Sequence, residues 1–338
     1  MKLTPGKLAG LKSVSDSRGV IAAAAMDQRG SLQKSLAKER GSAATGEDLE
    51  VFKTCVTDVL CQHASAILLD PEYGLPAAKH RHGKGLLLAY EKTGYDSATP
   101  GRLPDLLDVW SVRRLKEAGA DCIKILLYYT PFEKSHINDL KQAWIERIGD
   151  ECLAHDIPFF LEFVGYDADG GDEKTVAYAS KKPEIVSGAM AEFGKARYNV
   201  DVLKVEVPIV MEFVEGTKAF KGEKAYTRKE ALQHFRDAEG MTHKPFIYLS
   251  AGVSNPVFIE TLELAVESGT SFNGVLCGRA TWKDGIKVYA TKGAKAFEEW
   301  LNTQGVENIN NVNKALQGAH SWHQKVDQHA TLHEPVHA

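Results

Sequence analysis

Long apolar runs and an excess of one charge sign are both missing from this 338-residue sequence. Without an uncharged apolar stretch of about 20 residues, the chain cannot supply a membrane-spanning helix. Residues 1–19 contain no uninterrupted apolar segment, so we expect no secretory signal and a cytoplasmic location. The net charge of −4 and the isoelectric point near 6.3 argue against a dedicated nucleic-acid-binding or membrane-surface protein.

Cysteine is scarce, and its spacing excludes several kinds of site. The five cysteines are odd in number, scattered and never form a CxxC pair. We therefore expect reduced, buried thiols rather than a disulfide framework. The cysteines are Cys55, Cys61, Cys122, Cys152 and Cys277. The GxGxxG and GxxxxGK[ST] motifs of nucleotide-binding loops are also absent from the sequence.

Twelve histidines raise the question of a metal site, because metal ligands must cluster at fixed spacings. Five of them lie in the C-terminal stretch, away from every predicted strand end. They are His320, His323, His329, His333 and His337. His320 and His323 are spaced to share one helix face, but no HExxH motif or third ligand stands at a suitable position. We expect no metal ion and no cofactor.

Alternating apolar and helical segments predict the fold. Eight short apolar runs alternate with helical patterns, which is typical of a closed (β/α)₈ TIM barrel. The predicted strands are Val20–Met26, Ala64–Asp70, Gly85–Tyr90, Asp121–Tyr129, Ile157–Gly165, Asp201–Pro208, Pro245–Gly252 and Phe272–Gly278. The predicted helices include Pro5–Val14, Glu47–His63, Leu103–Ala118, Ile137–His155, Thr227–Glu239 and one that begins near Asn255. The alternative, a doubly wound sheet, usually has a Gly-rich turn where this chain has Asp27-Gln28-Arg29-Gly30.

The absence of a low-complexity linker predicts one domain over residues 1–338. We expect an N-terminal helix within residues 1–19. We expect residues from about 290 to 338 to form extra helices that wrap the base of the barrel, with a frayed tail at His329–Ala338. An apolar content of 43% suffices for the sizeable core that such a domain needs.

The strand Asp201–Pro208, DVLKVEVP, places a lysine inside an apolar run. Because side chains alternate along a strand, Val202, Lys204 and Glu206 share one face and the branched residues between them share the other. A buried lysine either pairs with an acid or loses its proton, and the neutral amine attacks carbonyl carbons. On this stretch alone, a structural lysine paired with an acid is the simpler interpretation.

Polar side chains at the ends of six predicted strands favour a site instead. In a barrel these ends meet at one rim, where active sites lie. The candidates are Asp27, Gln28 and Arg29 after the first strand, Lys124 in the fourth, Glu162 in the fifth, Lys204 in the sixth, Ser250 and Gly252 after the seventh, and Gly278 and Arg279 after the eighth.

These residue types suit one kind of chemistry. Like-charge repulsion from Lys124 is predicted to lower the pKa of Lys204 and supply a free amine. Glu162 is placed to move protons, and a role as counter-ion for the lysines is compatible with that work. The residues after the last two strands could hold a phosphate, with Arg279 adding a bidentate contact. Asp27 could orient sugar hydroxyls or form a rim ion pair with Arg29.

Seven segments resemble the tagatose-1,6-bisphosphate aldolase family over most of the chain. They are AAMDQRGSL, LLDPEYG, IKILLYY, FLEFVGY, LKVEVP, LSAGV and GVLCGRATW. The resemblance implies a class I, metal-independent aldolase that cleaves a ketose 1,6-bisphosphate to dihydroxyacetone phosphate and glyceraldehyde 3-phosphate. It also implies roles for the candidate residues: Lys204 as Schiff-base lysine, Glu162 as acid/base, Asp27, Gln28 and Lys124 as substrate-binding, and Ser250, Gly278 and Arg279 as phosphate-binding. From their places after the first and seventh strands, we add Arg29 as substrate-binding and Gly252 as phosphate-binding.

Several alternatives stay open at this level. The family is similar to sulfofructose-phosphate aldolases, so the second anionic group can be phosphate or sulfonate, and the preferred epimer can be tagatose or fructose. A non-catalytic sugar-phosphate sensor could have the same barrel and the same phosphate-binding residues. An isomerase or epimerase would need no buried lysine nucleophile. We expect a phosphorylated ketose as the partner, no nucleic acid, no membrane, and a homo-oligomer.

Overall fold

The computed structural model describes residues 2–92 and 99–326, and within them eight parallel strands close into a barrel. Around the barrel the strands follow the order β1-β10-β9-β6-β5-β4-β3-β2. The barrel strands are β1 (Ile21–Met26), β2 (Ala66–Leu69), β3 (Gly85–Ala89), β4 (Cys122–Tyr128), β5 (Phe159–Val164), β6 (Val202–Val205), β9 (Phe246–Leu249) and β10 (Gly274–Cys277). Each lies inside one predicted run, so the (β/α)₈ barrel is confirmed.

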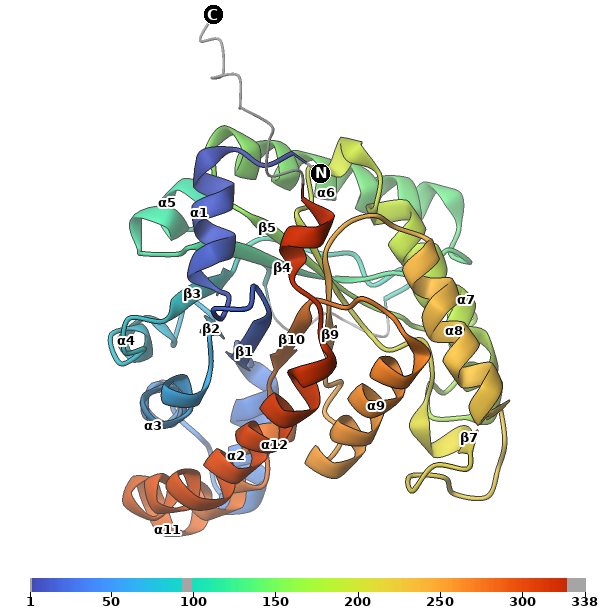
Figure 1. The fold of residues 1–338 in the computed structure, drawn as a ribbon. Coiled ribbons are helices and arrows are strands. Elements are labelled where there is room, and N and C mark those ends of the chain that lie inside the picture. The colour runs from blue at the N-terminus through green and yellow to red at the C-terminus, as the bar shows by residue number, and fades with distance from the viewer. Residues whose placement is uncertain (1, 93–98, 327–338) are drawn as a thin grey trace, which may run out of the picture.

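Helices surround the barrel, as Figure 1 shows. They are α1 (Pro5–Ser13), α2 (Gly30–Arg40), α3 (Gly46–Leu60), α4 (Leu75–Ala78), α5 (Val112–Glu117), α6 (Ser135–Ala154), α7 (Val176–Phe193), α8 (Arg228–Gly240), α9 (Asn255–Ser268), α10 (Arg279–Trp282), α11 (Gly285–Trp300) and α12 (Val306–Ala315). Capping boxes fix where two of them begin. Thr45 and Asp48 cap α3, and Thr227 and Glu230 cap α8, each pair satisfying free amides of the first turn.

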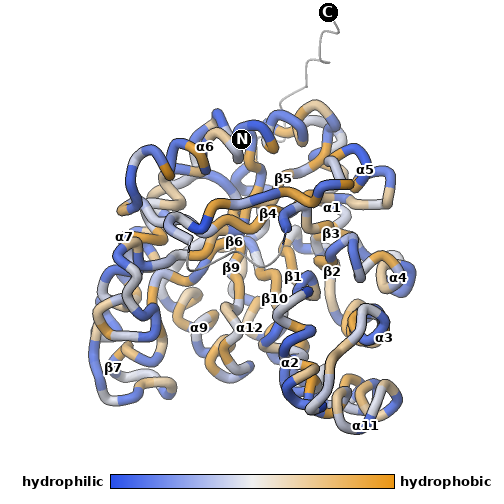
Figure 2. The backbone as a smooth tube through the Cα atoms, turned by 180° about the vertical axis from the view of Figure 1, so that it is seen from behind, coloured by the Kyte–Doolittle hydropathy of each residue, from blue (hydrophilic) through white to orange (hydrophobic). Residues whose placement is uncertain are grey.

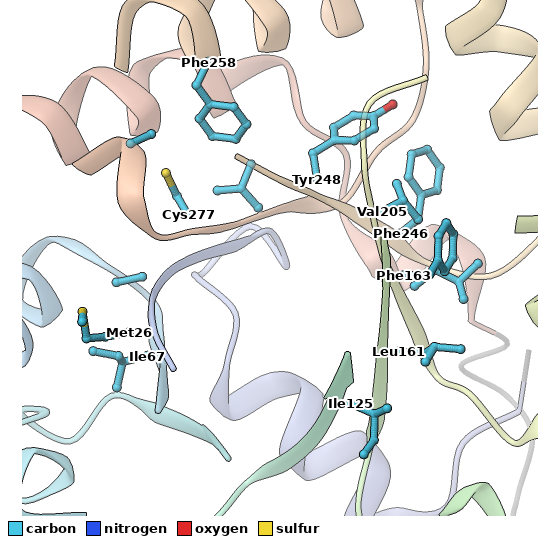
Figure 3. Packing of buried hydrophobic residues seen from close by; sticks show 14 of the residues in the cluster. Met26, Ile67, Ile125, Leu161, Phe163, Val205, Phe246, Tyr248, Phe258 and Cys277 are labelled. Carbon is cyan, nitrogen blue, oxygen red and sulfur yellow. The ribbon is translucent and has the colours of Figure 1, made fainter. Parts of the chain in front are cut away.

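Side chains alternate between two apolar layers along each strand. On β6, Val202 belongs to the cluster inside the barrel, while Leu203 and Val205 belong to the layer between barrel and helices. Figure 3 shows Val205 in that outer layer beside Phe163 of β5. Lys204 therefore points into the barrel, as the alternation in DVLKVEVP predicts. In Figure 2 the hydrophobic colour is likewise concentrated along the central strands.

Both ends of the chain close the base of the barrel, only partly as the sequence predicts. Leu11 of α1 and Trp322 pack into the inner cluster, and the Trp322 indole N–H donates to Ser15 Oγ at 2.8 Å. Of the segment after residue 290, the helical turn Trp322–Lys325 lies at the base as predicted, but α11 does not. Helix α11 packs instead against α2 and α3, with Phe297 stacked on Phe52, and lies at the opposite end of Figure 1 from α1.

Two other helix predictions need correction. The predicted helix Leu103–Ala118 is helical only from Val112, because residues before it run beside the end of β3, where the Leu107 N–H donates to the Tyr90 carbonyl at 3.1 Å. Helix α2 was not predicted, since only Leu32 and Leu36 of it are buried and its apolar periodicity is weak.

A two-stranded ladder of β7 (Val214–Glu215) and β8 (Tyr226–Thr227) follows β6. All five cysteines are buried free thiols, as expected. Over the described ranges, no helix is both long and apolar enough to cross a membrane. The predicted frayed tail, with His329, His333 and His337, lies outside the described residues.

Candidate active site

The ten residues predicted for the site all line one cavity of about 510 Å³. They reach it from six strands: Asp27, Gln28 and Arg29 follow β1, Lys124, Glu162 and Lys204 lie on β4, β5 and β6, Ser250 and Gly252 follow β9, and Gly278 and Arg279 follow β10. The cavity therefore opens where the carboxyl ends of the strands meet, which is the functional face of a barrel.

Lys124 is the centre of a buried charge cluster. Its ammonium lies 2.8 Å from a carboxylate oxygen of each of Asp27, Glu91 and Glu162, and the side chain is 1% exposed. Burial alone would lower the pKa of Lys124, but the three carboxylates outweigh it and raise that pKa well above the usual value. The sequence predicts that the Lys124 ammonium repels the Lys204 ammonium. Such repulsion needs a positive charge on Lys124 that no acid neutralises, and here three carboxylates neutralise it.

Asp27 is the ionised partner of this cluster. Burial would raise the pKa of its carboxyl, but Lys124 and Lys204 hold that pKa well below the usual range. Asp27 therefore remains a carboxylate and accepts a hydrogen bond from Lys124. The rim ion pair with Arg29 that the sequence left open does not form, because the Arg29 guanidinium pairs with Glu72 at 2.6 Å.

Lys204 shares one carboxylate oxygen with Lys124. Its Nζ lies 2.9 Å from Glu162 Oε2, which also receives the Lys124 ammonium. Glu162 and Lys204 are direct partners in the β5–β6 register, and their side chains point into the barrel. The Lys204 amine, 4% exposed, lines the cavity beside a proton acceptor. This arrangement can perform nucleophilic attack coupled to proton transfer.

The turn after β9 makes a close approach to Arg279. Ala251 and Gly252 both have positive φ, 47° and 78°, so their backbone takes the left-handed turn that favours glycine. A Cβ on Gly252 would lie 2.7 Å from the Arg279 guanidinium carbon. Glycine at this position therefore lets the guanidinium pack on the backbone and face the cavity.

Comparison with known proteins agrees with this geometry. Residues 21–284 match the model of the DeoC/LacD family aldolases. The chain belongs to this aldolase family. It is 53% identical over 321 residues to the tagatose 1,6-diphosphate aldolase of Staphylococcus haemolyticus, covering 94% of this chain and 98% of that one. It is 53% identical over 328 residues to tagatose 1,6-diphosphate aldolase 2 of Enterococcus faecalis, covering 96% and 98%.

A solved structure shares the fold. Fructose-bisphosphate aldolase from Plasmodium falciparum, solved with TRAP and a small-molecule inhibitor, matches with a TM-score of 0.69 at 13% identity, over 95% of this chain and 97% of that chain. The resemblance noted in the sequence is thus confirmed at the level of the family. The protein is an aldolase, a carbon–carbon lyase.

Glu91 is a residue of the aldolase site that the sequence analysis missed. It lies two residues after β3, accepts a hydrogen bond from the Lys124 ammonium at 2.8 Å, and is buried. Burial raises the pKa of Glu91 despite the attraction of Lys124 and Arg29. A polar residue directly after the apolar run GLLLAY was the available signal, the same one that marked Asp27.

Ser31 and Lys34 of α2 also line the aldolase cavity, and they were missed because α2 itself was not predicted. The side chains of Lys34 and Arg279 have no hydrogen-bond or ion-pair partner among residues 2–92 and 99–326. The other cations of the cavity are paired with acids: Arg29, Lys92, Lys124 and Lys204. Within the part of the chain that the structure describes, Lys34 and Arg279 are thus the cavity cations left to neutralise an anion.

Proposed function

We propose that this aldolase cleaves a ketose 1,6-bisphosphate, first of all tagatose 1,6-bisphosphate, to dihydroxyacetone phosphate and glyceraldehyde 3-phosphate through a Schiff base on Lys204. The observation that carries the proposal is the contact of 2.9 Å between the buried Lys204 amine and Glu162 in the cavity. The names of the curated relatives support the choice of tagatose 1,6-bisphosphate.

The reaction begins with transfer of a Lys204 proton to Glu162 and attack of the neutral amine on the C2 carbonyl. Glu162 then returns a proton to the carbinolamine hydroxyl, which leaves as water and gives the iminium ion. Glu162, again a carboxylate, then takes the C4 hydroxyl proton, the C3–C4 bond breaks, and its electron pair moves through C2 to the iminium nitrogen. Glyceraldehyde 3-phosphate leaves, and the enamine is protonated at C3 and hydrolysed to dihydroxyacetone phosphate.

Lys124 gives Glu162 the orientation that these proton transfers need. Lys124 lies at the same distance from Glu162 as from Asp27 and Glu91. Its contact with Glu162 does not depend on Lys204, so Glu162 keeps its position when Lys204 becomes covalently bonded. Asp27, as a carboxylate, and Gln28, whose buried side-chain oxygen has no protein partner in the described part of the chain, are suited to accept hydrogen bonds from substrate hydroxyls.

The unpaired cations support a substrate with two anionic groups. Arg279, with the backbone of Gly252 and Gly278 and the Ser250 hydroxyl, is assigned to one phosphate. Lys34 and Ser31, on α2, are assigned to the second. A sulfonate in place of the distal phosphate, or a fructose in place of a tagatose configuration, would use the same groups, so a substrate panel must separate these alternatives.

Intact-mass measurement after incubation with dihydroxyacetone phosphate and borohydride tests the proposal. We expect one covalent adduct that maps to Lys204 and forms equally with and without EDTA. No adduct, together with activity lost in EDTA, would overturn the Schiff-base mechanism. Binding of the bisphosphate with neither adduct nor turnover would instead favour a sugar-phosphate sensor.

We also propose that the chain is a single domain that works in the cytoplasm as a homo-oligomer. Five buried free thiols support a reducing compartment, and the packing of both terminal segments on one barrel supports the single domain. Light scattering on the purified protein gives the oligomeric state, and a monomeric mass would contradict this part of the proposal.

A further inference from the structure

We propose that Lys53 and Asp70, neither of which lines the cavity, act together as a positioning pair that holds Asp27 against Lys124. This inference rests on the proposed function only for its kinetic test. It concerns the segment LLDPEYG, whose residues have no place in the mechanism so far.

Lys53 reaches the site from behind, out of helix α3. Its Nζ donates to the carbonyls of Met26 and Gln28, both at 2.7 Å, and lies 2.6 Å from Asp70 Oδ1. Two of the three N–H donors of the ammonium group are thus hydrogen-bonded to carbonyl oxygens, and the contact with Asp70 is an ion pair. The two carbonyls belong to the residues on either side of Asp27, and Lys53 therefore fixes the backbone of Asp27 from both sides. We call Lys53 with these two contacts the clamp.

Asp70 holds the clamp in place from the neighbouring strand. Met26 and Leu69 are register partners on β1 and β2, so Asp70 follows its strand next to Asp27. Its second carboxylate oxygen accepts from the Tyr73 N–H at 2.8 Å, which ties Lys53 to the turn of the same segment. Lys53 and Asp70 are both fully buried. Because Lys53 and Asp70 are not exposed and do not contact the cavity, their positions are fixed. They are therefore suited to support the neighbouring Asp27.

The pair also acts on Asp27 through its charge. Lys53 adds to the attraction of Lys124 and Lys204 that keeps the pKa of Asp27 low. Loss of the clamp would therefore both release the backbone and weaken the ionised state of Asp27. A displacement of about 1 Å at a substrate-positioning group can cost on the order of 10²-fold in rate.

The test compares two buried lysine–aspartate pairs at opposite ends of the barrel. The variant Lys53→Met/Asp70→Asn removes the clamp without leaving an unpaired buried charge. The control Lys7→Met/Asp201→Asn removes the pair at the base, where the two residues are also buried and lie 2.8 Å apart. Urea unfolding of both variants shows how much of any effect is due to stability alone.

We expect the Lys53→Met/Asp70→Asn variant to lose about 10- to 100-fold in kcat with little change in KM. Its acid limb in the kcat/KM profile should shift to higher pH, because Asp27 becomes easier to protonate. The control should keep the kcat and the pH profile of the wild type. The milder Asp70→Glu variant keeps both buried charges but displaces the Lys53 ammonium. It should show a smaller loss of kcat with an unchanged acid limb, and it serves if the double variant does not fold.

A crystal structure of the variant separates this inference from the proposed function, because it needs no activity. We expect the contact of 2.8 Å between Asp27 Oδ2 and Lys124 Nζ to lengthen or break. An unchanged contact with wild-type kcat would overturn the positioning role. If the wild-type protein forms no borohydride-trapped adduct, the Schiff-base function fails, while a broken contact in the variant still supports the clamp.

Discussion

Glu162 and Lys204 face each other across β5 and β6, direct partners in the strand register, with Oε2 and Nζ 2.9 Å apart. The same oxygen lies 2.8 Å from Lys124. One carboxylate thus serves two lysines, of which Lys124 has two further acidic partners and Lys204 none among the described residues. This asymmetry assigns the structural role to Lys124 and leaves Lys204 available for chemistry.

Replacing the nucleophile tests that assignment most directly. Lys204→Met keeps the length and apolar stem of the side chain, so we expect a folded protein whose kcat falls on the order of 10⁴-fold or more. The borohydride adduct should be absent. Lys141→Met is the matched control, since Lys141 is also buried but contacts Tyr166 outside the cavity. Substantial turnover by Lys204→Met would exclude the Schiff base at this position.

Removing the proton carrier should slow the reaction without removing the nucleophile. Glu162→Gln preserves the shape of the side chain but cannot exchange a proton, and we expect kcat to fall about 10²- to 10⁴-fold. Lys124 keeps Asp27 and Glu91 as partners, so the fold should persist. Rapid-quench trapping should show slower imine formation. A wild-type trapping rate would mean that Glu162 is only a counter-ion.

Replacing Arg279 or Lys34, the two unpaired cations, should weaken the binding of a different phosphate in each case. We expect Arg279→Met and Lys34→Met each to raise KM for the bisphosphate about 10-fold or more, because each loses a charge-assisted contact. With a ketose monophosphate, only one of the two variants should weaken binding. Equal effects of both variants on the monophosphate would contradict the assignment of Lys34 to the second anion.

A side chain at Gly252 is predicted to displace the Arg279 guanidinium. Gly252→Ala would place a Cβ 2.7 Å from the Arg279 guanidinium carbon, at a residue whose φ is 78°. We expect a loss of about 1 kcal/mol in the free energy of unfolding from the backbone conformation, together with a raised KM. Gly216→Ala provides the control, since it has a φ of 87° but open space around its Cβ. It should lose stability and keep its KM.

The low pKa of Asp27 predicts how stability changes with acid. In the unfolded chain Asp27 has its ordinary pKa of 3.8, and in the folded chain the pKa is lower. The stabilising contribution of Asp27 is therefore present above about pH 4 and lost as the pH falls further. Below pH 4, wild-type stability should fall more steeply than that of Asp27→Asn, by up to about 1.4 kcal/mol per pH unit. Urea unfolding at several pH values measures both slopes, and equal slopes would contradict the prediction.

Local sequence patterns were sufficient for the barrel and for most of the site. Apolar runs bounded by Gly, Pro and polar residues located all eight barrel strands, although each run extends beyond the hydrogen-bonded ladder. Polar residues within or just after these runs brought Asp27, Lys124 and Arg279 into one cavity. This succeeded because a parallel barrel places every strand end at the same rim. Where periodicity is weak, as in α2, the pattern failed and Lys34 was missed with it.

The sequence by itself thus determined the strand order along the chain, the inward direction of Lys204 and the chemical types gathered at the rim. Only the tertiary structure decided which charge pairs with which. Lys124 binds three acids rather than repelling Lys204. Arg29 forms an ion pair with Glu72, and Lys53 binds the backbone carbonyls around Asp27. These partners come from strands, helices and turns that are distant in the sequence. No local pattern specifies such contacts, because they depend on how distant segments meet in space.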